Sequence, residues 1–307
     1  MTRTMHEIPR PNFFIVGAPK CGTTSMYEYL EPHPEVFMSP RKEPHFFATD
    51  LQWQWDWNIT DEAEYLALFK NAGYAKRIGE ASTWYLYSSG AAQRIKAFSP
   101  DARIIVMLRN PVDMLRSLHW HSIRNGTEDL HDFAAALEAE EDRRSGRRIP
   151  KAAPFADALL YRTVPLYAQQ LSRYLQTFGR EQVLVIIFDD FADNERHEYL
   201  RVTDFLRIDP AFMPEFTVAN PGTARSGVPF PRFLRRHHRV HRLIQATTPA
   251  ALRRRLGSIL NRVSPAPPPK PPGRTEAERK LRAHFAPEIE DLSQLLDRDL
   301  THWCRVE

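Results

Sequence analysis

Three apolar runs, broken at one position by Arg103, predict buried strands along this chain of 307 residues. They cover residues 13–16, 102–108 and 183–188, and each is followed by a segment with helical spacing of its apolar positions. Strands that lack polar alternation are covered on both faces, as in parallel sheets, and parallel strands need crossover helices between them. The pattern therefore predicts an α/β fold of three layers, in which a central parallel sheet carries helices on both faces.

Helical patterns separate these strands. Their apolar residues recur at spacings of three and four, which places them on one face of a helix. The predicted helices cover residues 23–30, 62–70, 91–98, 112–124, 130–141, 165–178, 195–206 and 276–300. Trp53, Trp55 and Trp57 alternate along the chain, which predicts an extended segment with one aromatic face. Residues 264–273 (SPAPPPKPPG) are too rich in proline for a helix or a strand, and we expect an extended connection there.

Charge is distributed unevenly. No acidic residue stands between Glu215 and Glu276, whereas this interval holds twelve lysine and arginine residues. The rest of the chain has 30 basic and 38 acidic residues, so the net charge of +4 conceals one basic segment. Such segregation is typical of contact with an anionic partner, although a solvated basic helix gives the same pattern. We predict one domain over residues 1–307 with a basic, proline-rich insertion or flap at about 229–275, in which residues 232–262 are a candidate contact to an anionic membrane surface.

The remaining composition bears on the compartment. No apolar stretch approaches the length of a membrane span, and residues 1–12 are polar without a targeting pattern. Two cysteines, Cys21 and Cys304, do not make a disulfide framework. We therefore expect reduced thiols and a cytoplasmic location. We expect no metal site, because His237 and His241 share a helix face but lack a third ligand.

A buried strand, a tight turn and the start of a helix meet at residues 13–25 (FFIVGAPKCGTTS). A glycine-containing turn before a helix directs backbone N–H groups toward an anion. The spacing differs from the Walker pattern, because Lys20 precedes Gly22 and a threonine occupies the usual lysine position. The predicted phosphate-binding residues are Lys20, Cys21, Gly22, Thr23, Thr24 and Ser25. We assign no chemistry to the Cys21 thiol, although a position at a helix start would lower its pKa.

A second anion-binding element follows the apolar run at residues 102–108. Arg109 stands at the strand end, and Ser117 lies about two turns into the next predicted helix. Both side chains could therefore reach a single anion. Two phosphate sites far apart in the chain match a nucleotide that carries phosphates at both ends of its ribose.

These elements resemble the donor-binding motifs of sulfotransferases that use 3′-phosphoadenosine 5′-phosphosulfate (PAPS). Residues 19–25 (PKCGTTS) are similar to the 5′-phosphosulfate loop, and Arg109 with Ser117 to the 3′-phosphate element. Residues 32–36 and 42–47 resemble segments of heparan-sulfate-type and related bacterial members. The resemblance covers most of the chain and implies a P-loop-like fold. It also implies in-line transfer of a sulfuryl group to a hydroxyl of a small-molecule, glycan or lipid-linked acceptor, with adenosine 3′,5′-bisphosphate (PAP) as the product and no metal.

The resemblance also implies roles for individual residues. Lys20 would stabilise the charge that develops on the leaving 5′-phosphate. The base in those enzymes is a glutamate of the segment matched by residues 42–47, which makes Glu43 the first candidate and His45 the second. The residues that resemble a late basic loop closing on the 3′-phosphate are Arg225, Ser226 and Gly227.

Two other functions fit parts of the sequence. Asp189 and Asp190 would suit the metal-binding end of a Walker B strand in a P-loop kinase or NTPase, although aspartates also form turns and caps. A basic protein that binds a membrane surface or nucleic acid would use residues 225–274. The early lysine and the Arg109–Ser117 pair favour sulfuryl transfer. We therefore expect a nucleotide sulfate donor and a hydroxylated acceptor as partners, and no nucleic acid.

Overall fold

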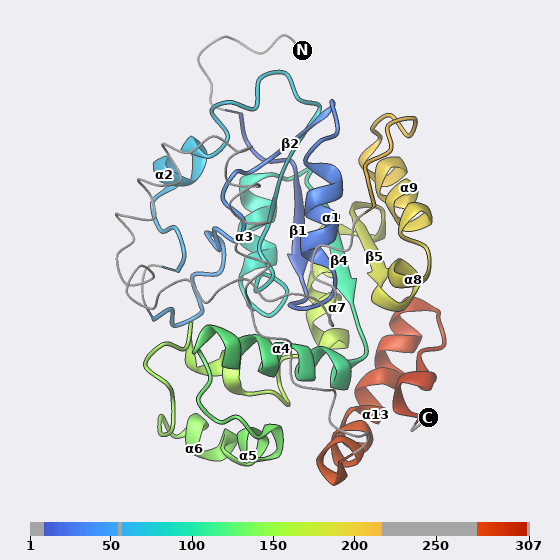
Figure 1. Cartoon of the computed structure of the whole chain (residues 1–307). Coiled ribbons are helices and arrows are strands. Elements are labelled where there is room, and N and C mark those ends of the chain that lie inside the picture. Colours follow the sequence, from blue (N-terminus) through green and yellow to red (C-terminus); the bar gives the residue numbers. More distant parts are fainter. Residues whose placement is uncertain (1–8, 55–56, 217–274, 306–307) are drawn as a thin grey trace. The chain divides into compact units, whose positions relative to one another are not determined.

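The computed structural model describes residues 9–54, 57–216 and 275–305. They belong to one compact unit, Met1–Thr217 with Thr275–Glu307. At its centre lies a five-stranded sheet of order β2-β3-β1-β4-β5, in which every neighbouring pair is parallel (Figure 1). The strands are β1 (Phe13–Gly17), β2 (Val36–Met38), β3 (Arg77–Ala81), β4 (Arg103–Leu108) and β5 (Val183–Ile187). The predicted parallel sheet is confirmed.

Helices cover both faces of the sheet. The helices are α1 (Thr23–Leu30), α2 (Glu62–Ala67), α3 (Ala91–Phe98), α4 (Pro111–Asn125), α5 (Phe133–Glu138), α6 (Glu140–Arg144), α7 (Tyr167–Phe178), α8 (Phe188–Asp193), α9 (Glu195–Leu206) and α13 (Glu276–Leu296). On one face, Phe216 joins α1 to α9, since its ring centre lies 5.1 Å from Tyr29 and 5.7 Å from Tyr199. On the other face, α7 contacts both α3 and α13. The three-layer α/β fold is confirmed.

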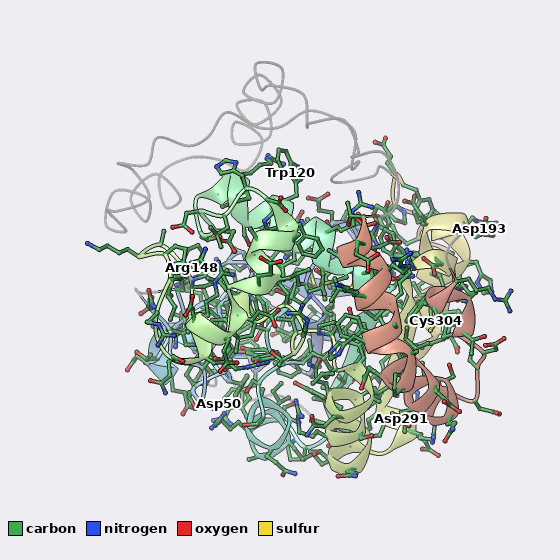
Figure 2. All side chains as sticks on the ribbon, turned by 90° about the horizontal axis from the view of Figure 1, so that it is seen from below. Asp50, Trp120, Arg148, Asp193, Asp291 and Cys304 are labelled. Atoms are coloured by element: carbon green, nitrogen blue, oxygen red, sulfur yellow. The ribbon has the colours of Figure 1, made fainter. Side chains whose placement is uncertain are left out.

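The order of the strands determines where a ligand can bind. After β1 the chain crosses to β2 on one side, and it later enters β4 on the other side of β1. Ligands of open α/β sheets bind outside the carboxyl ends of the strands at such a switch point. Helix α4 follows β4 directly and lies below these strand ends (Figure 1). The same end faces the viewer in Figure 2, where Trp120 marks α4 and Asp291 marks α13.

Strands β2 and β3 are absent from the sequence prediction. β2 reads Val-Phe-Met, which is apolar but only three residues long, and β3 reads Arg-Ile-Gly-Glu-Ala, which contains no apolar run. Gly79 allows β3 to approach β1 closely, because a Cβ atom there would lie 2.2 Å from the ring of Phe13. Both strands matter for function, since the segment after β2 runs along the carboxyl end of β3.

Several elements end at other residues than predicted. The segment at 130–141 forms two helices, α5 and α6, rather than one. The Asp132 carboxylate accepts a hydrogen bond from the N–H group of Ala134 at 2.7 Å, which starts α5 after this cap. The last helix ends at Leu296, because Asp297 adopts a left-handed conformation with a φ of 51°. The other elements shorter than predicted are α2, α7, β4 and β5.

Candidate active site

The loop between β1 and α1 brings Lys20 and Gly22 to the carboxyl end of the sheet. Both residues have positive φ values, 63° and 89°, and Gly22 directly precedes the first turn of α1. Gly22 has no side chain that could cap the helix, so the N–H groups of the first turn can bind an external acceptor. The N–H group of Ala18 donates to the carbonyl oxygen of Met107 at 2.6 Å, which attaches the loop to β4. The geometry suits an anion.

The Lys20 ammonium lies among other cations. Its Nζ atom is 3.5 Å from Nδ1 of His121 on α4. Burial lowers the pKa of Lys20, the negative charge of Glu43 opposes this shift, and neighbouring cations that include Arg109 reinforce it. An ammonium in these surroundings gains more from an incoming anion than one in water would.

Arg109 reaches the same loop from the end of β4. Its Nη1 atom donates to the carbonyl oxygen of Lys20 at 3.4 Å, and its guanidinium lies 4.4 Å from the centre of the Phe188 ring. The structure thus brings Lys20 and Arg109 together. Ser117 is half-buried on α4, and among the described residues no hydrogen bond links it to Arg109. Joint binding of one phosphate by Arg109 and Ser117 stays a prediction.

Cys21 is fully buried, and its Sγ atom lies 3.4 Å from the carbonyl oxygen of Pro19. Burial raises the pKa of the Cys21 thiol to about 12, and the positive charge of Arg109 only partly opposes this. The expectation of a lowered thiol pKa is wrong, because desolvation outweighs the helix start. Cys21 can therefore offer a ligand only its backbone N–H group. The hydroxyl residues of the first turn of α1 are Thr23, Thr24 and Ser25.

Glu43 and His45 lie in a loop after β2 whose backbone is strained. Their φ values are 61° and 52°, in the left-handed region that residues with a Cβ atom rarely adopt. The N–H group of Glu43 donates to the carbonyl oxygen of Ala81 at 2.9 Å, and that of His45 donates to Oγ of Ser82 at 3.0 Å. These bonds attach the loop to the carboxyl end of β3. Such strain persists only where the surroundings fix it, and it is concentrated at functional sites.

The Glu43 carboxylate has a partner on each side. Nζ of Lys42 lies 2.6 Å from Oε1, and Nε2 of His45 lies 3.6 Å from Oε2. Burial raises the pKa of Glu43, but the opposing effect of Lys42 and His45 together is larger. The pKa of Glu43 is therefore well below its ordinary value. Burial lowers the pKa of His45 by more than Glu43 raises it. The site therefore presents an ionised carboxylate beside a neutral imidazole at neutral pH.

Trp53 covers one side of this pair. Its ring stacks on the imidazole of His45, with ring centres 4.7 Å apart, and meets Phe155 edge-on at 5.0 Å. Trp57 is 40% exposed, and Trp55 lies outside the described residues. Trp53 and Trp57 lie outside any strand, so the described part of this segment forms no strand, and an extended loop with one aromatic face stays a prediction.

Three residues of the site were not found from the sequence: Lys42, His121 and Ser82. His121 stands four residues after Ser117, on the same helix face, and this spacing could have indicated it. Lys42 adjoins the candidate base and could also have been noticed. No local pattern identifies Ser82, because its hydrogen bond to His45 spans 37 positions.

Asp189 and Asp190 hold the C-terminal segment. Oδ2 of Asp189 accepts a hydrogen bond from the indole N–H of Trp303 at 2.7 Å, and Asp190 pairs with Arg298 at 2.7 Å. Both aspartates lie in the first turn of α8, directly after β5. Because both carboxylates already have structural partners, the arrangement does not favour a metal-binding Walker B strand.

Some predictions fall outside the described residues. These are the late basic loop of Arg225, Ser226 and Gly227, the histidines His237 and His241, and all but the last residue of the flap at 229–275. In the described ranges, no helix has the length and apolar character that a membrane crossing requires. The same ranges contain no group of three or more histidine, cysteine or acidic side chains placed to hold a metal ion. The expectation that no metal is needed stays a prediction.

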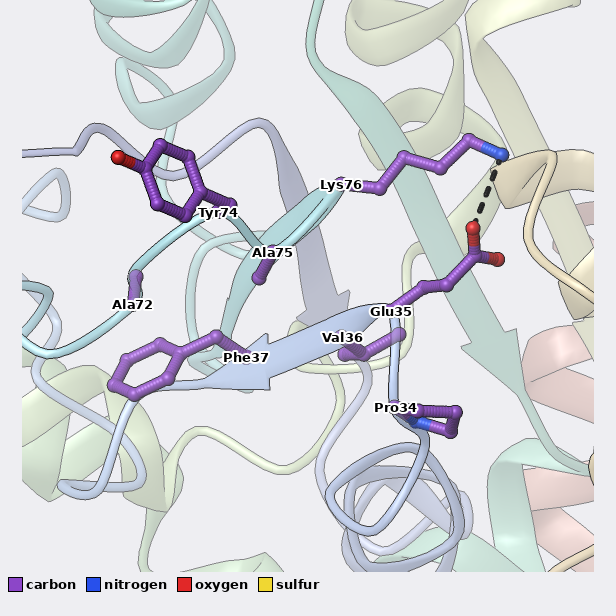
Figure 3. Close-up of a pocket in the computed structure, with 8 residues that line it drawn as sticks. All are labelled: Pro34, Glu35, Val36, Phe37, Ala72, Tyr74, Ala75 and Lys76. Carbon is purple, nitrogen blue, oxygen red and sulfur yellow. Dashed lines mark hydrogen bonds and ion pairs between the residues drawn. The ribbon is translucent and has the colours of Figure 1, made fainter. Parts of the chain in front are cut away.

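A pocket lies at the opposite end of the sheet. Its lining comes from residues 34–37, Ala72 and residues 74–76, at the amino ends of β2 and β3 (Figure 3). Nζ of Lys76 and Oε1 of Glu35 are 3.5 Å apart in this lining, and Tyr74 is 93% exposed. The lining includes none of the predicted site residues. Ligands of open α/β sheets bind at the carboxyl ends of the strands, so this pocket is not part of the candidate active site.

Comparisons of the sequence and of the structure with known proteins all identify sulfotransferases as relatives. A family model described as "Sulfotransferase domain" matches residues 10–216. The crystal structure of a sulfotransferase from Alicyclobacillus acidocaldarius is 32% identical with a TM-score of 0.72, over 97% of this chain and 100% of that one. Human carbohydrate sulfotransferase 15 is 30% identical over 65% of this chain, and human heparan sulfate glucosamine 3-O-sulfotransferase 6 is 29% identical over 64%. The matches cover 44% and 52% of these two proteins, so the chain spans about half the length of the curated relatives.

Proposed function

Because the chain belongs to the sulfotransferase family, we propose that it transfers a sulfuryl group from PAPS to a hydroxyl group of an acceptor. One observation carries the proposal. Lys20 and Arg109 meet where β1 and β4 end, and the charge of Lys20 is coupled to that of Glu43. Groups suited to phosphate binding and a group suited to accepting a proton therefore lie at one end of the sheet.

The donor nucleotide would bind across the ends of β1 and β4. Its 5′-phosphosulfate would accept hydrogen bonds from Lys20 and from the N–H groups of residues 22–25, and its 3′-phosphate would bind Arg109 and Ser117. The residues present fit such a ligand. Among the described residues Arg109 forms no ion pair, and the helix start at Gly22 has no side-chain cap.

In the transfer step, Glu43 would take the proton of the acceptor hydroxyl as its oxygen bonds to sulfur. Lys20 would stabilise the electron pair that the breaking sulfur–oxygen bond leaves on the 5′-phosphate of PAP. His45, which is neutral and 3.6 Å from Glu43, would orient the carboxylate. Negative charge would thus appear on the leaving oxygen, beside Lys20, as the carboxylate of Glu43 is neutralised by the proton.

For the acceptor we propose a sugar hydroxyl. The proposal is supported by the names of two relatives, a carbohydrate sulfotransferase and a heparan sulfate glucosamine 3-O-sulfotransferase. Trp53 gives the acceptor side an aromatic wall beside His45. A cytoplasmic location and a membrane contact through residues 232–262 stay predictions that independent experiments must address.

Binding of the donor product can be measured by thermal unfolding. PAP should raise the Tm of the protein, whereas Mg-ATP should not. Lys20→Ala and Arg109→Ala should each reduce the Tm shift with PAP, because each removes a cation from the phosphate sites. Lys76→Ala is a matched control, since its ion pair with Glu35 lies at the other end of the sheet. Stabilisation by Mg-ATP alone would overturn the proposal in favour of an NTPase.

The role of Glu43 requires a transfer assay with PAPS and heparan sulfate. Glu43→Gln should keep PAP binding and lower transfer by about 10²- to 10⁴-fold, the usual contribution of a positioned base. His45→Gln should have a smaller effect, because it leaves the carboxylate in place. Equal activity of Glu43→Gln and the unmodified protein would move the base to His45.

A further inference from the structure

Behind the candidate base lies a buried carboxylate whose hydrogen-bond partners, within the described ranges, are all hydroxyl groups. Glu80 in β3 is completely buried. Its Oε1 atom accepts hydrogen bonds from the hydroxyls of Tyr85 at 2.7 Å and Tyr65 at 3.1 Å, and its Oε2 atom accepts one from Oγ of Ser82 at 2.7 Å. No cation bonds to it among the described residues. A buried carboxylate costs stability unless its environment compensates, so its presence needs a reason.

Two of these hydroxyls also bind the backbone of the loop that carries the candidate base. Oγ of Ser82 accepts the N–H group of His45 at 3.0 Å, and the hydroxyl oxygen of Tyr85 accepts the N–H group of Phe47 at 3.3 Å. Each hydroxyl has one proton. It can accept from the loop in a fixed direction only if that proton is donated elsewhere, and Glu80 is the acceptor.

The third hydroxyl partner supports the same segment from its side chain. The ring of Tyr65 stacks on Phe46, with centres 4.3 Å apart and planes 9° apart. Residues 45, 46 and 47 are thus each held by a partner of Glu80. The two hydrogen-bonded positions lie two and four residues after Glu43. The N–H group of Glu43 itself donates to the carbonyl oxygen of Ala81, the neighbour of Glu80.

We infer that Glu80 is a positioning residue, which orients the hydroxyls of Ser82 and Tyr85 so that they hold residues 43–47 in the strained conformation that aims Glu43 at the acceptor. Left-handed φ values at Glu43 and His45 have to be imposed by the surroundings. The two hydroxyls contribute by accepting hydrogen bonds from the N–H groups of residues 45 and 47. The catalytic part of the inference rests on the proposed function.

The first test is amide hydrogen exchange in the full chain, which requires no acceptor. The amides of His45 and Phe47 should exchange slowly. Ser82→Ala should speed exchange at His45, and Tyr85→Phe should speed it at Phe47, because each removes the acceptor of that N–H group. Unchanged exchange at both amides in both variants would overturn the positioning role, whatever reaction the protein catalyses.

A matched control exists elsewhere in the chain. The hydroxyl of Tyr161 donates to the buried carboxylate of Glu128 at 2.8 Å, and Tyr161→Phe deletes the same type of bond. Tyr161→Phe and Tyr85→Phe should lower the Tm comparably. Only Tyr85→Phe should change exchange at residue 47. If Tyr161→Phe loosened residues 45–47 equally, general destabilisation would account for the effect and the inference would fail.

The second test uses transfer from PAPS to heparan sulfate. Ser82→Ala and Tyr85→Phe should lower kcat by about 10- to 100-fold, the usual cost of displacing a catalytic group by about 1 Å, with the Kd for PAP unchanged. In the Glu43→Gln background neither should lower the residual rate further, since the group they position has been removed. Undiminished kcat in both single variants contradicts the inference, whereas an active Glu43→Gln contradicts the proposed base.

Discussion

Glu80 and Glu128 are both buried carboxylates, but the fold accommodates them in opposite ways. Glu128 pairs with the Arg143 guanidinium at 2.8 Å and also accepts from Tyr161 and from the N–H group of Leu130. Burial raises the pKa of Glu128, but these partners lower it by more. At Glu80 burial prevails over three hydroxyl bonds, and its pKa is raised to about 7.

This difference matches two roles: Glu128 connects parts of the fold, whereas Glu80 positions the loop of the candidate base. Arg143 also donates to the carbonyl oxygens of Ala136 and Leu159, so the Glu128 pair connects α6 to the loop after α4 and to the segment near residue 159. In the described part of the chain no cation bonds to Glu80, which makes it costly to bury, yet its hydroxyl partners have directed lone pairs that can hold a strained loop. Functional sites are where such locally unfavourable choices are expected.

The largest effect should come from breaking the paired carboxylate. Arg143→Met leaves Glu128 buried without its cation, which should lower the free energy of unfolding by about 3–5 kcal/mol. Urea denaturation measures this change. PAP binding by the folded fraction should persist, because neither Lys20 nor Arg109 is among the hydrogen-bond partners of this pair.

A second variant guards against complete unfolding. Arg143→Met combined with Glu128→Leu removes both charges and should recover much of the lost stability. If Arg143→Met alone cost no stability, the claim that Glu128 depends on its cation would be contradicted.

The next effect concerns pH. Because folding raises the pKa of Glu80 from about 4.5 to about 7, the folded protein binds a proton in this interval that the unfolded chain releases. Stability from this group is therefore complete below pH ~4.5 and is lost as pH rises toward ~7, at up to roughly 1.4 kcal/mol per pH unit.

Glu80→Gln should remove this contribution to the pH dependence. Urea denaturation of both proteins between pH 4.5 and 8 gives the comparison, and the difference between their curves isolates Glu80. Burial also raises the pKa of Glu288 to about 7, but Glu288 contributes equally to both proteins. Parallel curves would show that Glu80 is already ionised throughout this range.

A smaller effect tests whether a neighbouring cation also lowers the pKa of a third carboxylate, that of Glu43. Lys42→Met removes the ammonium 2.6 Å from Glu43, so the pKa of Glu43 should rise. Activity requires ionised Glu43, and the acidic limb of the pH profile of kcat/KM should therefore move to higher pH by about one unit or more. Lys42→Arg keeps the charge and should leave the limb in place; a limb equally unmoved in Lys42→Met would contradict the role of this cation.

The smallest effect is expected from Tyr65→Phe. The hydroxyl of Tyr65 donates to Glu80 but touches no N–H group of the loop, and its ring keeps the stack on Phe46. Removal of this hydroxyl should cost about 0.5–1.5 kcal/mol of stability. The loss of kcat in the transfer assay should be smaller than for Tyr85→Phe. The reverse order would mean that the number of bonds to Glu80, rather than their connection to the loop, controls activity.

Local sequence patterns determined the layered fold and the main elements of the donor side. Apolar runs identify β1, β4 and β5, because strands covered on both faces are rich in apolar residues. The sequence also predicted the turn at Lys20 and Gly22 and the arginine at the end of β4. Each lies within a few residues of the strand or helix that positions it.

Only the tertiary structure decided how the acceptor side is built. The sequence offered Glu43 and His45 as candidates. It did not place them beside Ser82 and Glu80, because β2 is only three residues long and β3 lacks an apolar pattern. The bonds that hold this loop join residues 37 and 38 positions apart. Hydrogen bonds of that range follow from strand order and register rather than from any local period, which is why they become visible only in the folded chain.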